Sequence, residues 1–185
     1  DLVNKVNITT KGTFIGKGGA TLVGGGSAKF LGSVVNAKNL SNEGKITLSG
    51  DARYAGVGGI LGYVDASSDA PKTITFTGNT LNTGAINANN GSSGAARIGG
   101  LIGNANNYVT VVFNGPSKND APITVGGTTS STLYVGGYIG GLLTVATFKI
   151  NNTAENSKKA SITINGNSTG KLALGGVVGF ADTTS

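Results

Sequence analysis

A six-residue run of the form apolar-Gly-Gly-apolar-apolar-Gly occurs four times in this chain at nearly constant spacing. The four copies are residues 57–62, 98–103, 135–140 and 174–179, and the first glycine of each pair is separated from the next by 41, 37 and 39 residues. Repetition at a period of roughly 20 to 50 residues is typical of solenoids, whose units bury their apolar side by stacking on one another. A fifth, weaker copy is expected one period earlier, at Gly18 and Gly19.

Two other apolar runs recur between the glycine runs. One set comprises residues 28–32, 73–78, 109–115 and 146–151, and the other comprises residues 6–10, 45–50, 84–89, 122–127 and 161–166. Short apolar runs bounded by Gly, Asn, Ser and Thr are typical of β-strands. Helices are disfavoured because 33 of the 185 residues are glycine, which costs a helix about 1 kcal/mol per position relative to alanine.

These patterns predict an all-β fold, a parallel β-helix or β-solenoid. We expect about three short strands in each repeat of about 39 residues, and four to five repeats in a single domain covering residues 1–185. The expected repeats lie near 17–56, 57–97, 98–134 and 135–173, with a partial repeat at 174–185. Neither end resembles a capping element, and the first residue is Asp1 rather than Met. We therefore expect a segment of a longer repeat protein or a processed chain; the alternative is that the ends pair with like subunits in a filament.

Stacking of the repeats would place equivalent residues in columns about 4.8 Å apart. Glycine columns let the backbone turn or let another segment approach closely. The structural repeat glycines predicted in this way are Gly58, Gly59, Gly62, Gly99, Gly100, Gly103, Gly136, Gly137, Gly140, Gly175, Gly176 and Gly179.

Side-chain alternation along the glycine runs suggests a candidate contact surface. If each run is one straight strand, the residue after the glycine pair points to the opposite face from the apolar residue before the pair. These residues would form an outward-facing apolar column that could bind a partner surface or a sugar ring. Its members are Ile60, Leu101, Tyr138 and Val177. The alternative, which we favour, is that the remainder of each coil covers this column, because monomers seldom leave large apolar patches exposed.

The composition removes the usual parts of most enzyme mechanisms. The chain has no Cys and no His, so thiol nucleophiles, disulfides, Cys- or His-ligated metals and histidine general bases are excluded. Asp65 and Asp69 are close in sequence and could hold a cation, although two carboxylates in a Ser-rich loop are more often a solvated turn. We expect no enzyme activity, no catalytic residues, no metal and no cofactor.

The charge pattern argues against two classes of partner. The formal net charge is +6, but the basic residues are scattered and form no arm or patch, so no nucleic-acid partner is predicted. No apolar run approaches the roughly 18 residues of a membrane span, so no membrane insertion is predicted for this segment.

The repeated glycine runs resemble the GLUG motif, a short repeat of bacterial surface proteins that include adhesins and secreted peptidases. The resemblance covers the four glycine runs; Tyr138 departs from it, because the motif has an aliphatic residue there. It implies an extracellular or cell-surface β-solenoid and carries over no catalytic residues.

The expected function is therefore a non-catalytic structural or adhesive module of a secreted or surface-displayed bacterial protein. Its partner would be a protein or glycan of a host or neighbouring cell, or like subunits through the solenoid ends. The alternatives are a self-assembling subunit of an extracellular filament and, less favoured, a polysaccharide-active β-helix enzyme.

Overall fold

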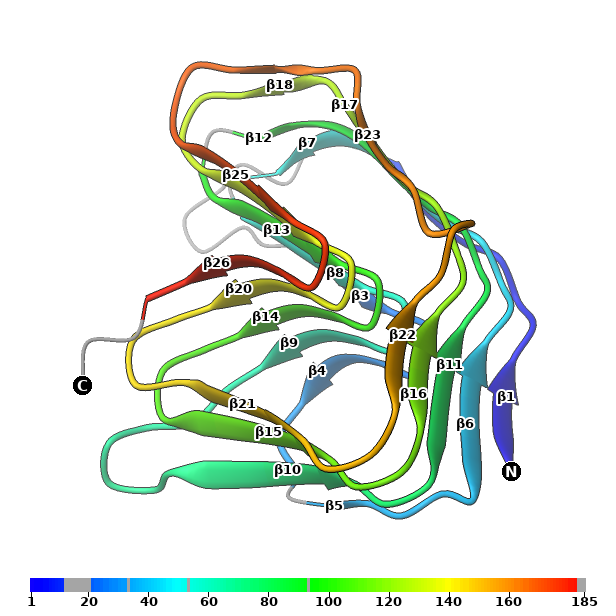
Figure 1. Ribbon diagram of the computed structural model, residues 1–185. Coiled ribbons are helices and arrows are strands. Elements are labelled where there is room, and N and C mark those ends of the chain that lie inside the picture. The colour runs from blue at the N-terminus through cyan, green and yellow to red at the C-terminus, as the bar shows by residue number, and fades with distance from the viewer. Residues whose placement is uncertain (12–20, 33, 53, 93, 183–185) are drawn as a thin grey trace.

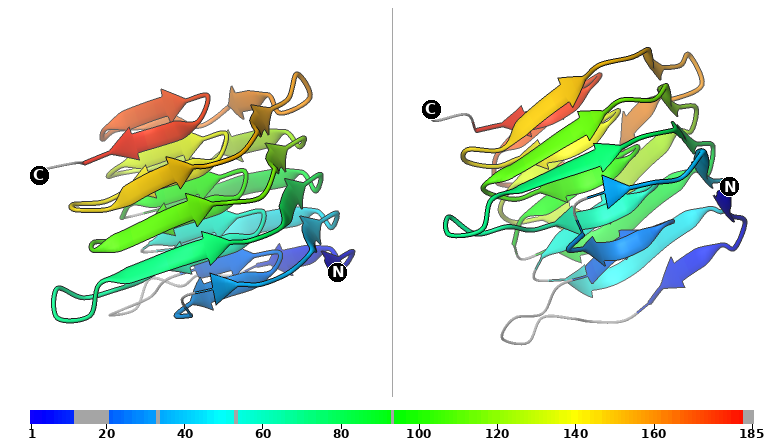
Figure 2. Two further views of the ribbon diagram at one scale, coloured as in Figure 1. Left: turned by 60° about the horizontal axis from the view of Figure 1, so that its bottom comes forward. Right: turned by 90° about the horizontal axis from the view of Figure 1, so that it is seen from below.

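Equivalent residues of successive repeats lie side by side as parallel strands. The computed structural model describes residues 1–11, 21–32, 34–52, 54–92 and 94–182, and every element within them is a β-strand. Each strand pairs in parallel with the strand one turn earlier or later, and the pairs build five sheets that run along the stack (Figure 1 and Figure 2). The predicted all-β, parallel β-solenoid is confirmed.

We call the five sheets A to E in the order in which the chain visits them. Sheet A contains β1 (Leu2–Asn4), β6 (Asn39–Asn42), β11 (Asn79–Asn82), β16 (Ser117–Asn119) and β22 (Ala154–Asn156). Sheet B contains β2 (Ile8–Thr10), β7 (Ile46–Ala52), β12 (Ile86–Ser92), β17 (Ile123–Gly126) and β23 (Ile162–Ile164); β18 (Thr128–Thr129) pairs with β12, and β24 (Asn167–Ser168) pairs with β18. Sheet C contains β3 (Thr21–Gly24), β8 (Ala55–Gly58), β13 (Ala96–Gly99), β19 (Leu133–Gly136) and β25 (Leu172–Gly175). Sheet D contains β4 (Ser27–Phe30), β9 (Leu61–Val64), β14 (Ile102–Ala105), β20 (Ile139–Leu142) and β26 (Val178–Ala181). Sheet E contains β5 (Val34–Val35), β10 (Lys72–Phe76), β15 (Val109–Phe113) and β21 (Thr147–Ile150).

All three predicted kinds of run form strands. The runs that include residues 45–50 lie in sheet B, and the runs that include residues 73–78 lie in sheet E. Each glycine run is shared between sheets C and D, because the chain turns at the glycine pair. The short strands of sheet A stand between sheets E and B and were not among the predicted runs.

Two expectations for the first repeat are wrong. Residues 28–32 were grouped with residues 73–78, but Lys29 pairs with Tyr63, which places β4 in sheet D. The first glycine pair was expected at Gly18 and Gly19, which lie outside the described residues, whereas Gly24 is the residue that pairs with Gly58. The reason is that these two equivalent glycines are only 34 residues apart, so counting back by the later period reaches too far.

Sheets C and D fold inward and divide the interior into two cores. In Figure 1 they run through the centre of the molecule, between sheet B above and sheet E below, and turn close to sheet A. One core lies between sheets B and C and includes the buried column of Ile46, Ile86 and Ile123. The other is enclosed by sheets D, E and A, where the rings of Phe76 and Phe113 stack at 4.5 Å.

The glycine columns allow sheets C and D to meet backbone to backbone. Gly58, Gly99, Gly136 and Gly175 occupy one register position. A Cβ atom on Gly58 would lie 2.0 Å from the Leu61 carbonyl oxygen, and one on Gly103 would lie 2.4 Å from the backbone nitrogen of Val57. No side chain fits at either position, so the narrow fold between the two sheets requires glycine.

The candidate contact surface lies mostly in the core. Ile60, Leu101 and Tyr138 are 0%, 0% and 1% exposed, and only Val177, in the last turn, is exposed at 45%. The straight-strand assumption failed because the chain reverses direction at the glycine pair, which sends the following residue into the core between sheets D, E and A. The covered alternative is therefore the one that the structure adopts.

A ladder of asparagines, buried in its three middle members and partly exposed at its ends, joins the turns where sheet A meets the glycine pairs. Each amide nitrogen donates to the side-chain oxygen of the asparagine one turn later, over 2.7 to 3.1 Å, through Asn4, Asn42, Asn82, Asn119 and Asn156. A Cβ atom on Gly59 would lie 2.4 Å from the Asn82 side chain, so the glycine makes room for the ladder. The asparagines of sheet A therefore pack against the glycine pairs, where the chain turns from sheet C to sheet D.

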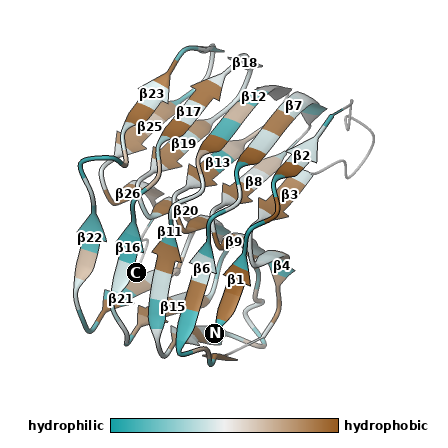
Figure 3. Cartoon of the chain, turned by 90° about the vertical axis from the view of Figure 1, so that its right-hand side faces the viewer, coloured by the Kyte–Doolittle hydropathy of each residue, from teal (hydrophilic) through white to brown (hydrophobic). Residues whose placement is uncertain are grey.

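Outward positions of sheet B carry the polar side chains. Figure 3 shows hydrophobic residues alternating with more polar ones along its strands. In β17, Ile123 and Val125 are buried while Thr124 is partly exposed. This alternation is expected of strands that face a core on one side only.

Candidate functional site

The outer faces of sheets C and D face each other and separate with distance from the glycine pairs. The resulting hollow, which we call the C–D cleft, has a volume of about 340 Å³. Its lining residues are Leu22, Lys29, Tyr54, Tyr63, Arg97, Asn104 and Asn106. Outward-facing positions of two adjacent sheets thus meet at one site.

The register explains why the hollow lies in this turn. In sheet C the outward column runs through Leu22, Gly56, Arg97 and Tyr134. Gly56 contributes no side chain, and a Cβ atom there would lie 3.2 Å from Leu22 Cδ2 and 3.5 Å from Tyr54 Cε1. Leu22 and Tyr54 therefore pack over the glycine, and together with Arg97 of the next turn they line the cleft.

Arg97 crosses the cleft from sheet C to sheet D. Its guanidinium carbon lies 5.1 Å from the centre of the Tyr54 ring and 5.9 Å from that of Tyr134, within the range of cation–π attraction. A Cβ atom on Gly141 would lie 2.7 Å from Arg97 Cδ, so this glycine of sheet D makes room for the arginine. In the following turns, the rings of Tyr134 and Phe180 stack with their centres 4.3 Å apart.

The side of the cleft formed by sheet D holds an ion pair. Lys29 Nζ lies 3.3 Å from Asp65 Oδ2, and Asn106 Nδ2 donates to Asp65 Oδ1 over 2.9 Å. Partial burial alone would raise the pKa of Asp65, but the hydrogen bond from Asn106 and the charge of Lys29 outweigh it and hold the pKa below its ordinary value. The Asp65 carboxylate is therefore ionised at neutral pH and already paired with Lys29 and Asn106.

Two tyrosines form the aromatic walls of the cleft. The rings of Tyr54 and Tyr63 meet edge to face, with centres 6.1 Å apart. Burial, reinforced by the nearby Asp65 carboxylate, raises the pKa of Tyr63 to about 12, and burial also raises the pKa of Tyr54. Both phenols therefore remain neutral at physiological pH.

Four buried polar atoms of the cleft have no hydrogen-bond partner among the described residues. They are Nδ2 and Oδ1 of Asn104, Nε of Arg97 and the hydroxyl oxygen of Tyr54, and the Asn104 residue is 0% exposed. Buried polar side-chain atoms are nearly always paired, and leaving one unpaired costs about 1 to 3 kcal/mol. The cleft thus contains unused hydrogen-bonding capacity.

Comparison of the chain with protein-family models, with curated proteins and with solved structures found no match. Within the part of the chain that the structure describes, no helix has the length and hydropathy needed to span a membrane.

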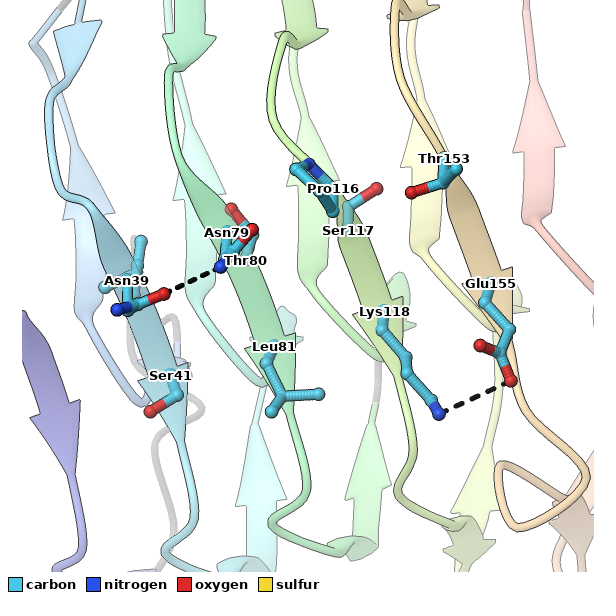
Figure 4. Close-up of a pocket in the computed structure, with 11 residues that line it drawn as sticks. Asn39, Ser41, Asn79, Thr80, Leu81, Pro116, Ser117, Lys118, Thr153 and Glu155 are labelled. Atoms are coloured by element: carbon cyan, nitrogen blue, oxygen red, sulfur yellow. Dashed lines mark hydrogen bonds and ion pairs between the residues drawn. The ribbon is translucent and has the colours of Figure 1, made fainter.

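A second hollow, of about 420 Å³, lies along sheet A and is shown in Figure 4. Its long polar side chains bind one another: Asn79 Nδ2 donates to Asn39 Oδ1 over 2.8 Å, and Lys118 forms an ion pair with Glu155 at 3.4 Å. Because these polar side chains are already paired with one another, they are less available to a ligand, and the C–D cleft is the stronger candidate for a binding site.

The two acids singled out from the sequence do not act together. Asp65 is held by Lys29 and Asn106, whereas Asp69 is exposed and accepts a hydrogen bond from the neighbouring Ser68 over 3.3 Å. Over the described ranges, no group of three carboxylates is placed to share a metal ion. A short antiparallel bridge between Ser67 and Ala70 encloses Asp69 in a tight turn.

The sequence reading missed the residues of the cleft. Tyr63 and Asn104 share one register position, as do Gly56 and Arg97, but the residue type changes from turn to turn, so a search for repeated residues passes over them. The available signal was Arg97, a charged residue directly before a glycine run, at the register position of Gly56 and Tyr134.

Proposed function

We propose that the chain is a non-catalytic structural and adhesive module of a secreted or surface-displayed bacterial protein. The observation that supports this most directly is the in-register stack, in which five sheets and the asparagine ladder join every turn to its neighbours. In a solenoid each turn contacts only the adjacent turns, so such joints determine its stiffness. The resemblance of the glycine runs to the GLUG motif adds support for a location outside the cell.

A surface on the side of the stack would serve the adhesive part of this role. The C–D cleft opens laterally and carries charged and aromatic side chains, so a partner could bind there without interrupting the stack. A stiff module with a lateral site can present that site at a distance from the surface that anchors it.

Bead attachment tests the proposal. Beads that carry the purified chain should adhere under flow to bacterial or host cell surfaces, and beads that carry the urea-unfolded chain should not. Size-exclusion chromatography with light scattering should give a monomer, and incubation with polysaccharides should release no new reducing ends. Equal attachment of folded and unfolded chains, or release of reducing ends, would contradict the proposal.

A self-assembling filament subunit is the second candidate, favoured by apolar residues at the two ends of the stack. Leu2 in the first turn is 57% exposed, and Leu172 and Leu174 in the last turn are 50% and 51% exposed. Stacking of one copy on another would cover them. Concentration-dependent polymers seen by light scattering and electron microscopy would support this role over the monomeric module.

A further inference from the structure

We propose that the C–D cleft binds a sugar residue that carries a carboxylate, so that the partner of this module is an acidic glycan. The inference rests on the adhesive role proposed above and names the chemistry of its ligand. Four features of the cleft support it: its size, its unpaired amide, its aromatic walls and its uncompensated cation.

The volume fits a single small ring. Small-molecule sites usually occupy about 300 to 1,000 Å³, and the cleft, at about 340 Å³, lies at the lower end of that range. Leu22 and Arg97 occupy the register position of Gly56 in the turns on either side, so their side chains limit how much of a longer ligand can enter. One sugar residue of a chain would enter, and the rest of the chain would lie outside.

The Asn104 amide suits a hydroxyl group. Its nitrogen donates and its oxygen accepts, and neither has a partner in the described protein. A sugar hydroxyl both donates and accepts, so it can satisfy the two atoms of an amide at once. An aliphatic ligand would leave both unpaired.

The aromatic walls suit the apolar face of a sugar ring. Tyr54 and Tyr63 meet at 88°, so their rings form two sides of a corner. Aromatic walls with a few placed polar groups are typical of small-ligand sites. The walls therefore favour a ring over a free inorganic anion.

The charge of the cleft favours a carboxylate. Lys29 is neutralised by Asp65 at 3.3 Å, whereas no carboxylate within the described ranges forms an ion pair with Arg97. The cleft thus carries one positive charge in excess. The planar guanidinium matches the geometry of a carboxylate, and its contacts with Tyr54 and Tyr134 hold it in one orientation.

Calorimetry and ligand-observed NMR on the full chain test this proposal. Glucuronate and galacturonate oligosaccharides should bind, with a dissociation constant on the order of 1 mM per sugar residue engaged. Neutral glucose and galactose oligosaccharides of equal length should bind at least tenfold more weakly. Equal binding of neutral sugars, or preferential binding of sulfated sugars without carboxylates, would overturn the assignment.

Two variants and a matched control locate the site. Arg97→Gln should weaken uronate binding at least tenfold, while Lys158→Gln, which removes one positive charge from an exposed turn, should leave binding unchanged. Asn104→Leu replaces the unpaired amide with an apolar group of similar volume. It should also weaken binding at least tenfold, yet leave the thermal midpoint unchanged or raised, because no hydrogen bond within the described protein is lost.

A lowered midpoint for Asn104→Leu would show that the amide supports the fold, and would overturn its role as a binding group. The bead assay separates the two proposals. If attachment persists unchanged with Arg97→Gln beads and in excess free uronate, the adhesive role stands and the acidic-glycan site is wrong. If uronate binds but the beads never attach, the site stands and the adhesive role is wrong.

Discussion

At the scale of single residues, the second glycine of each repeated pair is determined by what lies against it. A Cβ atom on Gly100 would lie 2.1 Å from the Gly137 carbonyl oxygen and 2.4 Å from the Asn119 side chain, whereas a Cβ atom on Gly176, the equivalent residue of the last turn, would meet nothing within 4 Å. The same sequence position is therefore obligatory in one turn and free in another.

We predict that Gly100→Ala lowers the free energy of unfolding by about 3 kcal/mol or more, because backbone atoms on the neighbouring turn would have to move. Gly176→Ala should change it by less than about 0.5 kcal/mol, the usual range for an exposed site. Urea unfolding followed by circular dichroism measures both. Equal losses in the two variants would contradict the packing described here.

The repeated glycines could be predicted from the sequence. The predicted contact surface of Ile60, Leu101, Tyr138 and Val177 was wrong because of the backbone conformation at the glycine pair. Alternation of side chains holds only along an extended strand, and the chain reverses direction at the glycine pair. A repeated glycine indicates that another segment of the chain packs closely against the backbone, but it does not indicate on which face of the strand that segment lies.

Tyr63 gives a second residue-scale prediction, since burial and Asp65 raise its pKa to about 12. The unfolded chain would lose this proton near pH 10, whereas the folded protein retains it up to about pH 12. The contribution to stability is complete below pH 10 and is lost as the pH rises through the folded pKa. Absorbance titration at alkaline pH, compared between the native chain and Tyr63→Phe, should assign the ionisation near pH 12 to Tyr63. A difference spectrum that titrates near pH 10 would disagree.

At the scale of elements, the strands of sheet A contain two asparagine contacts that differ in burial. Asn82 accepts from Asn42 over 2.8 Å and donates to Asn119 over 3.0 Å, and it is 0% exposed. Asn79, three residues earlier in the same strand, donates to Asn39 over 2.8 Å at an exposed position. β11 therefore forms asparagine–asparagine hydrogen bonds at one buried position, Asn82, and at one exposed position, Asn79.

We predict that Asn82→Ala lowers the free energy of unfolding by about 2 to 4 kcal/mol, because the amides of two neighbours lose their buried partner. Asn79→Ala should cost less than about 1 kcal/mol, because water replaces the lost contact. Chemical unfolding of the two variants under identical conditions gives the comparison. If the two losses are the same size, the buried ladder does not stabilise the turns in the way its geometry indicates.

Sheet A was missed from the sequence because its strands carry few large apolar residues at their buried positions. Their inward side chains include Thr80, Ser117 and the asparagines, which a hydrophobic pattern reads as a connection. Apart from β5, β18 and β24, which have only two residues each, the strands of sheets B and E were predicted correctly because they contain alternating aliphatic residues, and alternation is the signal that a sequence shows most clearly.

At the scale of the whole molecule, the solenoid predicts that an entire turn can be removed if the register is kept. Ile98 and Val135 share one register position, so deletion of residues 98–134 joins Arg97 to Val135 without changing which side chains face inward. After the deletion Ile162 would stack on Ile86, and Asn156 would meet Asn82, because each occupies the same column as the residue it replaces.

We predict that this shortened chain, which lacks 37 of 185 residues, keeps its β-sheet circular dichroism and unfolds cooperatively. Its denaturant m-value should fall by about one fifth, because the m-value scales with the surface exposed on unfolding. Deletion of residues 98–133 instead joins Arg97 to Tyr134, which occupy the same register position. That change of one residue turns every following inward side chain of the strand outward, so this variant should lose the cooperative transition. If both deletions fold equally well, the columns do not determine the architecture; if neither folds, the turns depend on more than their immediate neighbours.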